Sequence, residues 1–255
     1  MANFDGKVAF VTGAGSGIGA AMALTLAHGN ASVMCADINE QSAQATAARL
    51  EEAGAKADAI GLDVADSAAV KAALERTFSQ FGGLHVLMNN AGVGSLHSWE
   101  TTVNINLNGV YYGMAHACPI MAANGGGAIV NTASIAGLNA LVRAPSWENT
   151  PDRLEGVNAY VAAKHGVVGI TKQFAVNYGK LGVRVNAVCP GYIVTPMTEP
   201  ARDVDGGVEF LESLHPMGRL GEAAEVAAVA AFLASDAASF VNGAVVPVDG
   251  GYSAR

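Results

Sequence analysis

Short apolar runs alternate along the chain with longer stretches in which apolar residues recur at helical spacing. The short runs predict strands, and several are nearly all apolar, as expected for strands buried on both faces of a parallel sheet. Alternating strands and helices imply parallel βαβ units with right-handed crossovers. Strands are predicted at Lys7–Val11, Ser32–Ala36, Ala57–Leu62, Leu84–Met88, Ala128–Thr132, Val183–Val188 and Ala244–Val248.

The longer stretches predict the helices between these strands. They are expected at Ile18–His28, Glu40–Ala53, Ser67–Phe81, Thr102–Ala123, Ala159–Tyr178 and Glu222–Ala234. Three irregular segments, Val93–Thr101, Leu138–Asn158 and Thr195–Leu220, each follow a strand. Ligands bind at the carboxyl ends of strands in open α/β sheets, so we expect the substrate near these segments. One domain over residues 1–255 is the simplest organisation, although the length alone would also allow two small domains.

Composition and charge narrow the possible functions. Hydrophobic residues make up 51% of the chain, which argues for a packed core and against disorder. The formal net charge of −8 argues against nucleic-acid binding. Cys35, Cys118 and Cys189 lack metal-type spacing, so we predict buried reduced thiols and no metal site. We see no signal core and no membrane-spanning apolar run, and we expect a cytoplasmic protein without a membrane partner.

A glycine-rich turn lies between the first predicted strand and the first predicted helix. Glycines keep such a turn tight and let the backbone approach a pyrophosphate, while the helix N-terminus offers free N–H groups. The pattern G-x-G-x-x-A fits from Gly15 to Ala20, whereas G-x-G-x-x-G fails from Gly13 because Ile18 replaces its last glycine. A purely structural turn is the alternative. The residues predicted to bind a dinucleotide here are Gly13, Ser16, Gly17, Ile18 and Gly19.

Acidic residues follow the second and third predicted strands. A carboxylate at Asp37 can accept hydrogen bonds from the adenosine ribose and would repel a 2′-phosphate. Neither Ser16 nor Ile38 supplies a compensating positive charge, so NAD is favoured over NADP. Alternatively, Asp37 caps the next helix. Asp63 and Val64 could hold the adenine, although Asp63 could equally be a loop or cap residue.

The fourth predicted strand ends in Asn89-Asn90-Ala91-Gly92. The small Ala91-Gly92 pair permits close approach of a ligand, and the asparagines could equally tie loops together. We expect both roles, with Asn90, Ala91 and Gly92 nearer the cofactor.

Tyr160 and Lys164 are four residues apart and therefore share one helical face. A free phenol has a pKa of about 10, and a nearby ammonium favours the phenolate and lowers that value. The pair could thus act as an acid/base at neutral pH. An ordinary exposed helix pair is the alternative.

Taken in order, these motifs resemble the short-chain dehydrogenases/reductases in their single-domain, NAD-preferring form. The resemblance covers nearly the whole chain and implies an α/β fold, a Rossmann-type doubly wound parallel sheet flanked by helices. The motifs that carry it are Thr12–Gly19, Asn89–Gly92, Asn106, Ser134, Tyr160-x-x-x-Lys164, Pro190-Gly191 and Asp249-Gly250-Gly251.

The resemblance also implies a role for each residue of a four-residue site. Tyr160 would be the general acid/base, and Lys164 would lower its pKa and hold the nicotinamide ribose. Ser134 would hydrogen-bond the substrate oxygen, and Asn106 would support a water-linked proton path to Lys164. Thr132 is a close neighbour of Ser134, while Asn104 and Asn108 flank Asn106, but Ser134-x-x-Gly137 and Asn106-Leu107-x-Gly109 match the family patterns.

The loop after the sixth predicted strand is expected to meet the nicotinamide. By resemblance, Pro190, Gly191, Ile193 and Thr195 would contact this end of the cofactor, and a simple turn is the alternative. The helix Glu222–Ala234 and the strand before Asp249 resemble the family's subunit contacts. A homotetramer is expected by analogy, with a dimer next.

The expected function is NAD(H)-dependent interconversion of a secondary alcohol and a ketone, with an apolar aryl, alicyclic or steroid-like substrate. Two alternatives remain: a nucleotide-binding scaffold without turnover, and a dehydratase or epimerase of the same fold.

Ser134 and Tyr160 are 26 positions apart, about twice the usual gap in the family, so Leu138–Asn158 is interpreted as an insertion. It could border the substrate, with Trp147 as an apolar wall, or be a surface excursion or subunit contact. His97 could be a substrate contact but is expected to be a surface histidine. The candidate pocket residues are Leu138, Ala140, Val142, Tyr192, Val194 and Met197.

Overall fold

The computed structural model describes residues 2–142 and 151–255, with only the backbone described at residue 152. Seven parallel strands form one sheet in the order β3-β2-β1-β4-β5-β6-β9. This is the doubly wound topology expected from the sequence, and the strand order reverses between β1 and β4. The strands are β1 (Val8–Thr12), β2 (Ser32–Asp37), β3 (Ala57–Gly61), β4 (Val86–Asn89), β5 (Gly127–Thr132), β6 (Val183–Pro190) and β9 (Val245–Val248).

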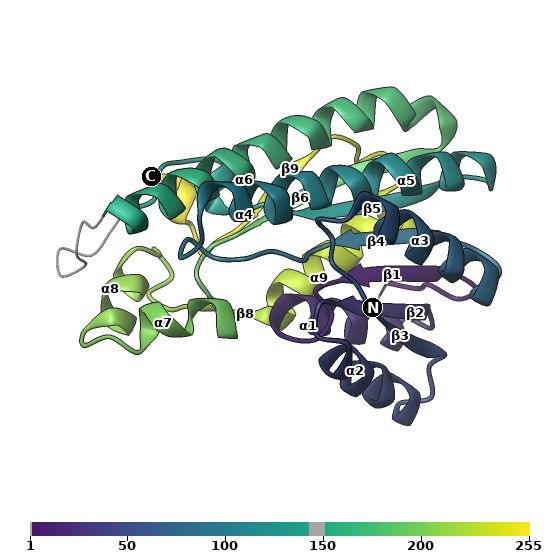
Figure 1. The fold of residues 1–255 in the computed structure, drawn as a ribbon, viewed down its shortest axis with the longest axis horizontal. Coiled ribbons are helices and arrows are strands. Elements are labelled where there is room, and N and C mark those ends of the chain that lie inside the picture. The colour runs from purple at the N-terminus through teal and green to yellow at the C-terminus, as the bar shows by residue number, and fades with distance from the viewer. Residues whose placement is uncertain (1, 143–150) are drawn as a thin grey trace.

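Helices cover both faces of the sheet (Figure 1). One face carries α1 (Gly17–His28), α2 (Glu40–Glu52) and α9 (Ala223–Ala234). The opposite face carries α3 (Ser67–Phe81), α5 (Gly109–Ala123) and α6 (Pro151–Tyr178), with α4 (Trp99–Val103) packed against α6. A two-stranded sheet of β7 (Ile193–Val194) and β8 (Gly221–Glu222) lies apart, together with α7 (Glu199–Arg202) and α8 (Gly207–Ser213).

The core consists of two large apolar clusters, one on each face of the sheet. Along β1, Ala9 and Val11 belong to the cluster beneath α1, α2 and α9, whereas Phe10 belongs to the cluster beneath α3, α5 and α6. This division follows from the period of two along a strand, because successive side chains point to opposite faces. The three cysteines are buried and free, as predicted.

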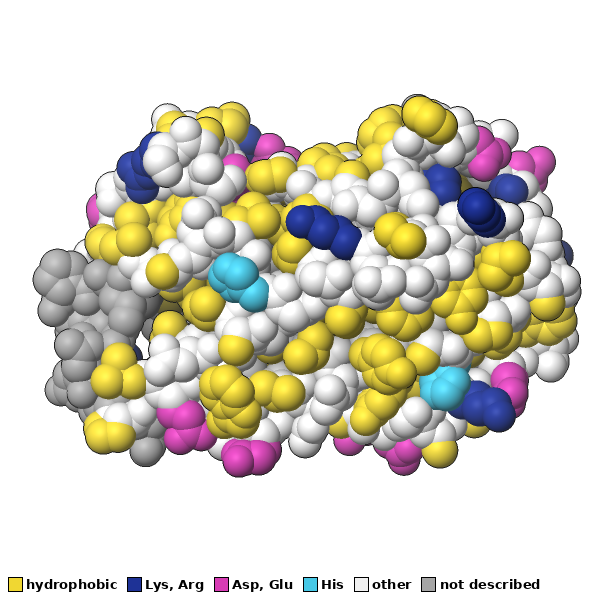
Figure 2. Space-filling view, turned by 90° about the horizontal axis from the view of Figure 1, so that it is seen from above, with side chains coloured by type: hydrophobic (Ala, Val, Ile, Leu, Met, Phe, Trp, Pro, Cys, Tyr) yellow, Lys and Arg dark blue, Asp and Glu magenta, His cyan; other side chains and the backbone are white. Residues whose placement is uncertain are grey.

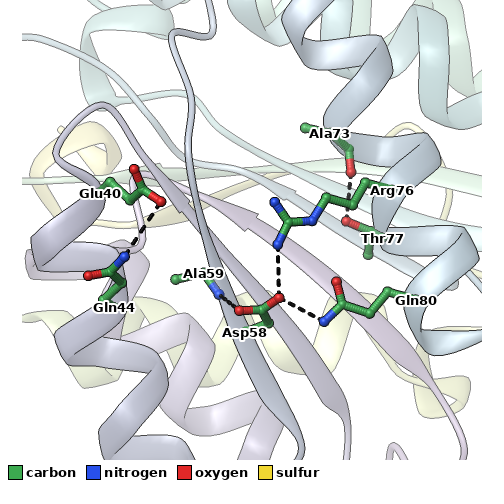
Figure 3. Close-up of polar contacts among 8 residues, drawn as sticks. All are labelled: Glu40, Gln44, Asp58, Ala59, Ala73, Arg76, Thr77 and Gln80. Carbon is green, nitrogen blue, oxygen red and sulfur yellow. Dashed lines mark hydrogen bonds and ion pairs between the residues drawn. The ribbon is translucent and has the colours of Figure 1, made fainter.

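A polar cluster anchors α3 to the edge strand β3 (Figure 3). The Asp58 carboxylate accepts hydrogen bonds from Arg76 at 3.1 Å and Gln80 at 2.7 Å, both on α3. It also accepts one from the Ala59 backbone N–H at 2.8 Å. These contacts stabilise β3, which is the edge strand of the seven-stranded sheet and pairs on one side with β2.

The structure corrects the predicted helix boundaries in two places. The segment Leu138–Asn158 was expected to be irregular up to residue 158, yet α6 begins at Pro151. Proline is favoured in the first turn of a helix because its missing N–H is not needed there. The helix predicted at Thr102–Ala123 begins at Trp99 and contains a π-helical turn, η1 (Asn104–Asn108), between α4 and α5.

The segment Thr195–Leu220 is also more regular than predicted. It contains the short 3-10 helix η4 (Pro196–Thr198), then α7 and α8. Among the helices described, none is long and apolar enough to cross a membrane. The described residues also contain no cluster of three or more His, Cys, Asp or Glu side chains suited to a metal ion.

Candidate active site

A cleft of about 600 Å³ opens where β1, β4, β5 and β6 end. This is the edge at which open α/β sheets bind ligands, beside the reversal of strand order. Of the predicted site residues, the glycine turn, Asp37, Asn90–Gly92, Ser134, Tyr160, Lys164 and the segment after β6 all contribute to its lining. Residues more than 170 positions apart in the sequence therefore meet in one cavity.

The glycine-rich turn forms one end of the cleft. Gly13 adopts a φ of +65°, and a Cβ there would lie 2.9 Å from the Ala91 Cα atom, so only glycine fits. Ser16 precedes α1 but its side chain makes no capping hydrogen bond, which leaves the first N–H groups of the helix open to a ligand. Gly13, Ser16, Gly17 and Ile18 line the cleft, whereas Gly19 is buried. Gly19 instead packs against Gly13 and the Asn90 amide.

Hydrogen bonds tie the ends of three strands together beneath this turn. The Thr12 hydroxyl accepts hydrogen bonds from the Asn90 and Ala91 backbone N–H groups at 2.9 and 3.0 Å. The Asn90 amide donates to the Thr12 carbonyl, and the Thr132 hydroxyl donates to the Asn90 side-chain oxygen. Asn89 is buried and bonds to Asn131. The predicted tie between loops is therefore present. Asn90, Ala91 and Gly92 line the cleft, and their contact with a cofactor stays a prediction.

Asp37 lies at the end of β2 and lines the cleft. Its carboxylate accepts hydrogen bonds from the Gly15 N–H at 2.9 Å and the Asn39 N–H at 3.0 Å. The side chain that caps α2 is Asn39, which accepts from the Ser42 N–H. The alternative that Asp37 caps this helix is therefore wrong, and its carboxylate faces the glycine turn.

Asp63 and Val64 do not belong to the described lining of the cleft. The Asp63 carboxylate accepts a hydrogen bond from the Ala65 N–H at 2.9 Å, which is a local turn interaction. The Val64 side chain packs against Gly109 at the start of α5. An adenine contact by either residue stays a prediction.

Tyr160 and Lys164 project from α6 into the cleft. The Lys164 ammonium donates a 2.8 Å hydrogen bond to the Thr132 carbonyl and lies 5.6 Å from the centroid of the Tyr160 ring. Burial lowers the pKa of Lys164 to about 8. Burial also raises the pKa of Tyr160, while a hydrogen bond with Ser134 lowers it. The phenol is thus held in its neutral form unless neighbouring groups stabilise the phenolate.

Ser134 is brought to Tyr160 by a close approach of two backbone segments. It precedes the short 3-10 helix η2 (Ile135–Gly137) and accepts a hydrogen bond from the Ala136 N–H at 3.1 Å. A Cβ on Gly137 would lie 2.6 Å from the Lys164 carbonyl oxygen. The glycine three residues after Ser134 therefore lets α6 pack directly on this segment, which explains the Ser-x-x-Gly spacing in physical terms.

Asn106 is fully buried in the π-helical turn and does not line the cleft. Its side-chain amide makes two hydrogen bonds with the Val93 backbone, donating to the carbonyl at 2.9 Å and accepting from the N–H at 2.8 Å. A Cβ on Gly92 would lie 2.8 Å from the Asn106 oxygen and 3.8 Å from the Lys164 nitrogen. Asn106 thus fixes the backbone just after Gly92, which lies close to Lys164. Its position in a π-helical turn is consistent with a functional site, because such turns often occur there.

The end of β6 and the segment that follows it form another part of the lining. Pro190, Gly191, Ile193 and Thr195 all line the cleft, as expected from the sequence. A Cβ on Gly17 would lie 3.2 Å from the Thr195 methyl carbon, so this wall meets the glycine turn. The Thr195 carbonyl is held by the Arg202 guanidinium at 3.2 Å.

The predicted substrate residues divide into three groups. Val142, Tyr192 and Met197 line the cleft. Leu138, Ala140 and Val194 are not among the described lining residues. Leu138 packs on the core beneath α5 and α6, and Val194 alternates with the buried Ile193 and points the other way. Trp147 lies outside the described residues.

Tyr192 is supported by an aromatic cluster. Its ring makes edge contacts with His215 and Tyr252, with centroids 5.8 and 6.3 Å apart. Burial is the main cause that raises the pKa of Tyr192, so its hydroxyl stays protonated. The neighbouring Cys189 thiol also stays protonated, because burial raises its pKa to about 11.

Sequence reasoning did not identify several of the side chains that line the cleft. Arg153 and Val157 lie seven and three residues before Tyr160 and share its helical face. An extension of the α6 prediction back to Pro151 would have identified both. The other lining residues include Leu96, Leu141, Pro200, Ala201 and Val204. They belong to the three irregular segments near which the substrate was expected, but no local pattern identifies them individually. His97 lines the cleft as well, so it lies where it can meet a substrate.

Known proteins resemble this chain over nearly its full length. A family model described as enoyl-(acyl carrier protein) reductase matches residues 13–253. Cyclohexanol dehydrogenase of Acinetobacter sp. (strain SE19) is 43% identical, over 99% of this chain and 97% of that protein. The cis-4-hydroxycyclohexanecarboxylate dehydrogenase of Sinomonas cyclohexanicum is 44% identical, over 98% of each chain. The crystal structure of levodione reductase has a TM-score of 0.88 and 37% identity, over 99% of both chains.

Proposed function

This chain belongs to the short-chain dehydrogenase/reductase family, and we propose on this basis that it uses NAD(H) and Tyr160 to interconvert a ring secondary alcohol and its ketone. The class of reaction, oxidoreduction of secondary alcohols and ketones, follows from the relatives. The observation that carries the catalytic assignment is the convergence of Ser134, Tyr160 and Lys164 on one cleft.

The cleft fits a nicotinamide dinucleotide. The glycine turn offers a close backbone approach and open N–H groups at the start of α1, which suit a pyrophosphate. When bound, the cofactor supplies or accepts the hydride. Asp37 supports NAD over NADP because its carboxylate lies at the glycine turn, where it would repel a 2′-phosphate. The next residue, Ile38, is 74% exposed and carries no charge that could offset this repulsion.

The side chains in the cleft have different roles in the proton transfer to and from the substrate oxygen. In alcohol oxidation Tyr160, as phenolate, accepts the hydroxyl proton, and in ketone reduction the phenol returns it to the carbonyl oxygen. Ser134 bonds to Tyr160, and its single hydroxyl proton can instead be donated to the substrate oxygen, which stabilises negative charge there. Lys164 places a positive charge beside the ring and favours the phenolate. Asn106 positions this arrangement through Val93.

An alicyclic substrate is supported by the relatives and by the walls of the cleft. Both relatives named above act on cyclohexane-ring alcohols according to their names, one uncharged and one bearing a carboxylate. Apolar side chains such as Val142, Val157 and Met197 surround the space beyond Tyr160 and Ser134. A saturated ring with its hydroxyl directed at Tyr160 matches this distribution.

The test is turnover of a panel of ring alcohols and ketones with NAD(H) and NADP(H), followed by absorbance. The Tyr160→Phe variant should bind NADH with unchanged affinity, measured by fluorescence, but lose activity by about 1,000-fold or more, the range of a lost general acid/base. Retained turnover in Tyr160→Phe would refute the mechanism. A protein that binds NADH but turns over no panel member would contradict the proposed substrate class and favour the scaffold alternative.

We also propose that the chain forms a homotetramer. Figure 2 looks onto the face formed by α4, α5 and α6 and shows hydrophobic side chains over much of it. Tyr111 on α5 is 46% exposed and Val176 on α6 is 77% exposed. The rings of Tyr111, Phe174 and Tyr178 pack in a row between the two helices. Sedimentation velocity tests the proposed tetramer, and a monomeric species would contradict it. The Val176→Glu variant should weaken the assembly.

A further inference from the structure

Tyr192 is held in the lining of the cleft through its backbone and its ring. Its backbone N–H donates a 3.2 Å hydrogen bond to His215 Nε2, and the two rings make an edge contact. The His215 Nδ1 atom donates to the Leu211 carbonyl oxygen in α8 at 2.8 Å, which leaves Nε2 as the acceptor. A Cβ on Gly191 would lie 2.7 Å from His215 Nε2, so glycine before Tyr192 allows this close approach.

The turn at residues 249–254 also supports the Tyr192 ring. Tyr252 makes an edge contact with this ring, with 6.3 Å between the centroids. It begins a short 3-10 helix, η6 (Tyr252–Ala254). The Asp249 carboxylate fixes the turn by accepting hydrogen bonds from the Gly251 and Ser253 N–H groups at 3.0 and 2.9 Å. The motif that begins at Asp249 therefore acts on the cleft through Tyr252.

The hydroxyl groups of these two tyrosines lack hydrogen-bond partners among the described residues. Tyr192 is half-buried and lines the cleft, and its hydrogen bond to His215 uses the backbone and not the hydroxyl. The Tyr252 hydroxyl is buried and unpaired within the described part of the chain. Buried polar groups are normally hydrogen-bonded, because an unpaired one costs desolvation free energy. Two unpaired hydroxyls on adjacent rings indicate a place for a polar group of a ligand.

This place lies close to the reacting oxygen. Tyr192 packs against the apolar cluster that contains Ile135, the residue after Ser134. Burial is the main cause that raises the pKa of Tyr192, and charge on Tyr252 or Tyr160 would raise it further. The phenols are therefore within electrostatic reach of one another. Tyr192 stays protonated while Tyr160 exchanges its proton, so it remains a hydrogen-bond donor beside the Ser134–Tyr160 pair.

We infer that the Tyr192 hydroxyl donates a hydrogen bond to a second oxygen of the substrate, on the carbon next to the one that exchanges hydride. The preferred substrates are then ring 1,2-diols and the corresponding α-hydroxyketones, ahead of ring alcohols with a single oxygen. This inference rests on the proposed function, since it takes the reacting oxygen to lie at Tyr160 and Ser134. A phenol already fixed by its neighbours loses little conformational freedom on binding, which favours such a contact.

The test compares trans-cyclohexane-1,2-diol with trans-2-methylcyclohexanol, in which a methyl group replaces the second hydroxyl. The wild-type holoenzyme should oxidise the diol with the higher kcat/KM, mainly through a lower KM. Tyr192→Phe removes one oxygen and keeps the ring. It should lower kcat/KM for the diol by about tenfold, as expected for one lost hydrogen bond, and for the methyl compound by less than about threefold. The cis isomers are compared in the same way, and a preference that depends on Tyr192 in either pair supports the inference.

Two further variants isolate the hydroxyl responsible. Tyr178→Phe removes a hydroxyl from a ring that stacks on Phe174, outside the described lining of the cleft, and should leave the preference unchanged. Tyr252→Phe keeps the ring contact with Tyr192 and should retain the preference, and a full transfer of the effect to this variant would overturn the assignment. Equal effects of Tyr192→Phe on the diol and the methyl compound, or a weakened affinity for NADH, would also overturn it.

Calorimetric titration of the same compounds into the protein saturated with NADH separates this inference from the proposed function. A wild-type preference for the diol that Tyr192→Phe abolishes supports the inference even if neither compound turns over, in which case the proposed reaction fails alone. Turnover of both compounds with no preference for the diol overturns the inference and leaves the proposed reaction standing.

Discussion

The Lys164 ammonium lies 5.6 Å from the centroid of the Tyr160 ring, and the two side chains are held in a site where burial opposes charge on both. Burial lowers the pKa of Lys164 to about 8 and raises that of Tyr160. Each group therefore depends on its neighbours to carry charge. The Thr132 carbonyl supports the ammonium, and Ser134 supports the phenolate.

The buried charge of the Lys164 ammonium should lower the free energy of unfolding. The pKa falls from an ordinary 10.5 to about 8, which corresponds to about 3 kcal/mol against the charged form in the folded state. Loss of the Thr132 hydrogen bond offsets about 1 kcal/mol of this in a Lys164→Met variant. At pH 7 the variant should therefore be more stable than wild type by about 2 kcal/mol while losing activity.

The pH dependence checks the origin of this effect. Below pH 8 both folded and unfolded states hold the proton, so the penalty is fully present. Between pH 8 and 10.5 only the unfolded state keeps it, so wild-type stability rises relative to the variant as pH increases. Urea unfolding at pH 7, 8 and 9 measures the difference, and a gap that widens with pH would contradict this account.

Removal of the Ser134 hydroxyl should move the pH profile of alcohol oxidation to higher pH. The hydrogen bond from Ser134 lowers the pKa of Tyr160, so a Ser134→Ala variant should have a more basic phenol. Oxidation needs the phenolate, and its rate at pH 7 should fall by about 100-fold, whereas ketone reduction should extend to higher pH. Profiles of kcat in both directions measure this. Ser134→Thr keeps a hydroxyl and should retain the wild-type midpoint, and an unshifted Ser134→Ala profile would show that the bond does not tune Tyr160.

Asp37 should determine the choice between NAD and NADP. An Asp37→Asn change removes the negative charge and keeps one side-chain oxygen, so it retains an acceptor for only one of the Gly15 and Asn39 N–H groups. The ratio of kcat/KM for NAD over NADP should fall by about tenfold, and by about 100-fold when Ile38→Arg adds a charge for the 2′-phosphate. The Ile38→Leu variant changes the same exposed side chain without adding a charge, so it should leave the ratio unchanged and serves as the control for Ile38→Arg. A ratio that is unaffected by both changes would place the discrimination elsewhere.

His85 should make the amino end of β1 sensitive to acid. Its Nδ1 atom accepts a 2.9 Å hydrogen bond from the Val8 N–H, so protonation at Nδ1 would remove the acceptor. Burial, with a smaller effect of Lys7, lowers the pKa of His85 below its ordinary value of 6.5. This contribution to stability is present above pH 6.5 and is lost as pH falls through the lowered value. The midpoint of thermal unfolding between pH 5 and 8 should fall more steeply for wild type than for His85→Asn, and parallel curves would exclude this role.

Local patterns were enough to predict the sheet and most of the site. A strand buried on both faces must be nearly all apolar, and a turn that approaches a phosphate needs glycine. Strands such as β1, and the turn at Gly13, are therefore recognisable one segment at a time. Tyr160 and Lys164 were predicted to be neighbours for the same reason, since spacing along a helix defines its faces. The convergence of Ser134 on Tyr160 was implied only by the family resemblance.

The start of α6 shows where local reasoning ends. The segment before Tyr160 contains charges and two prolines, which resemble a loop in isolation. In the folded chain this helix begins at Pro151, and Gly156 packs closely against the Ser95 carbonyl. The Glu155 carboxylate accepts a hydrogen bond from the Trp99 N–H at 2.7 Å. These contacts join segments far apart in the sequence, and they determine that Arg153 and Val157 line the cleft.

The sequence by itself predicted the fold, and it identified the candidate cofactor turn and the candidate catalytic side chains, because these depend on short-range spacing and on residue chemistry. The tertiary structure decided which side chains line the cleft and how burial changes the pKa values of Tyr160 and Lys164. Both depend on packing between distant segments, since desolvation and the shape of a cavity are properties of all the walls together and not of any one of them.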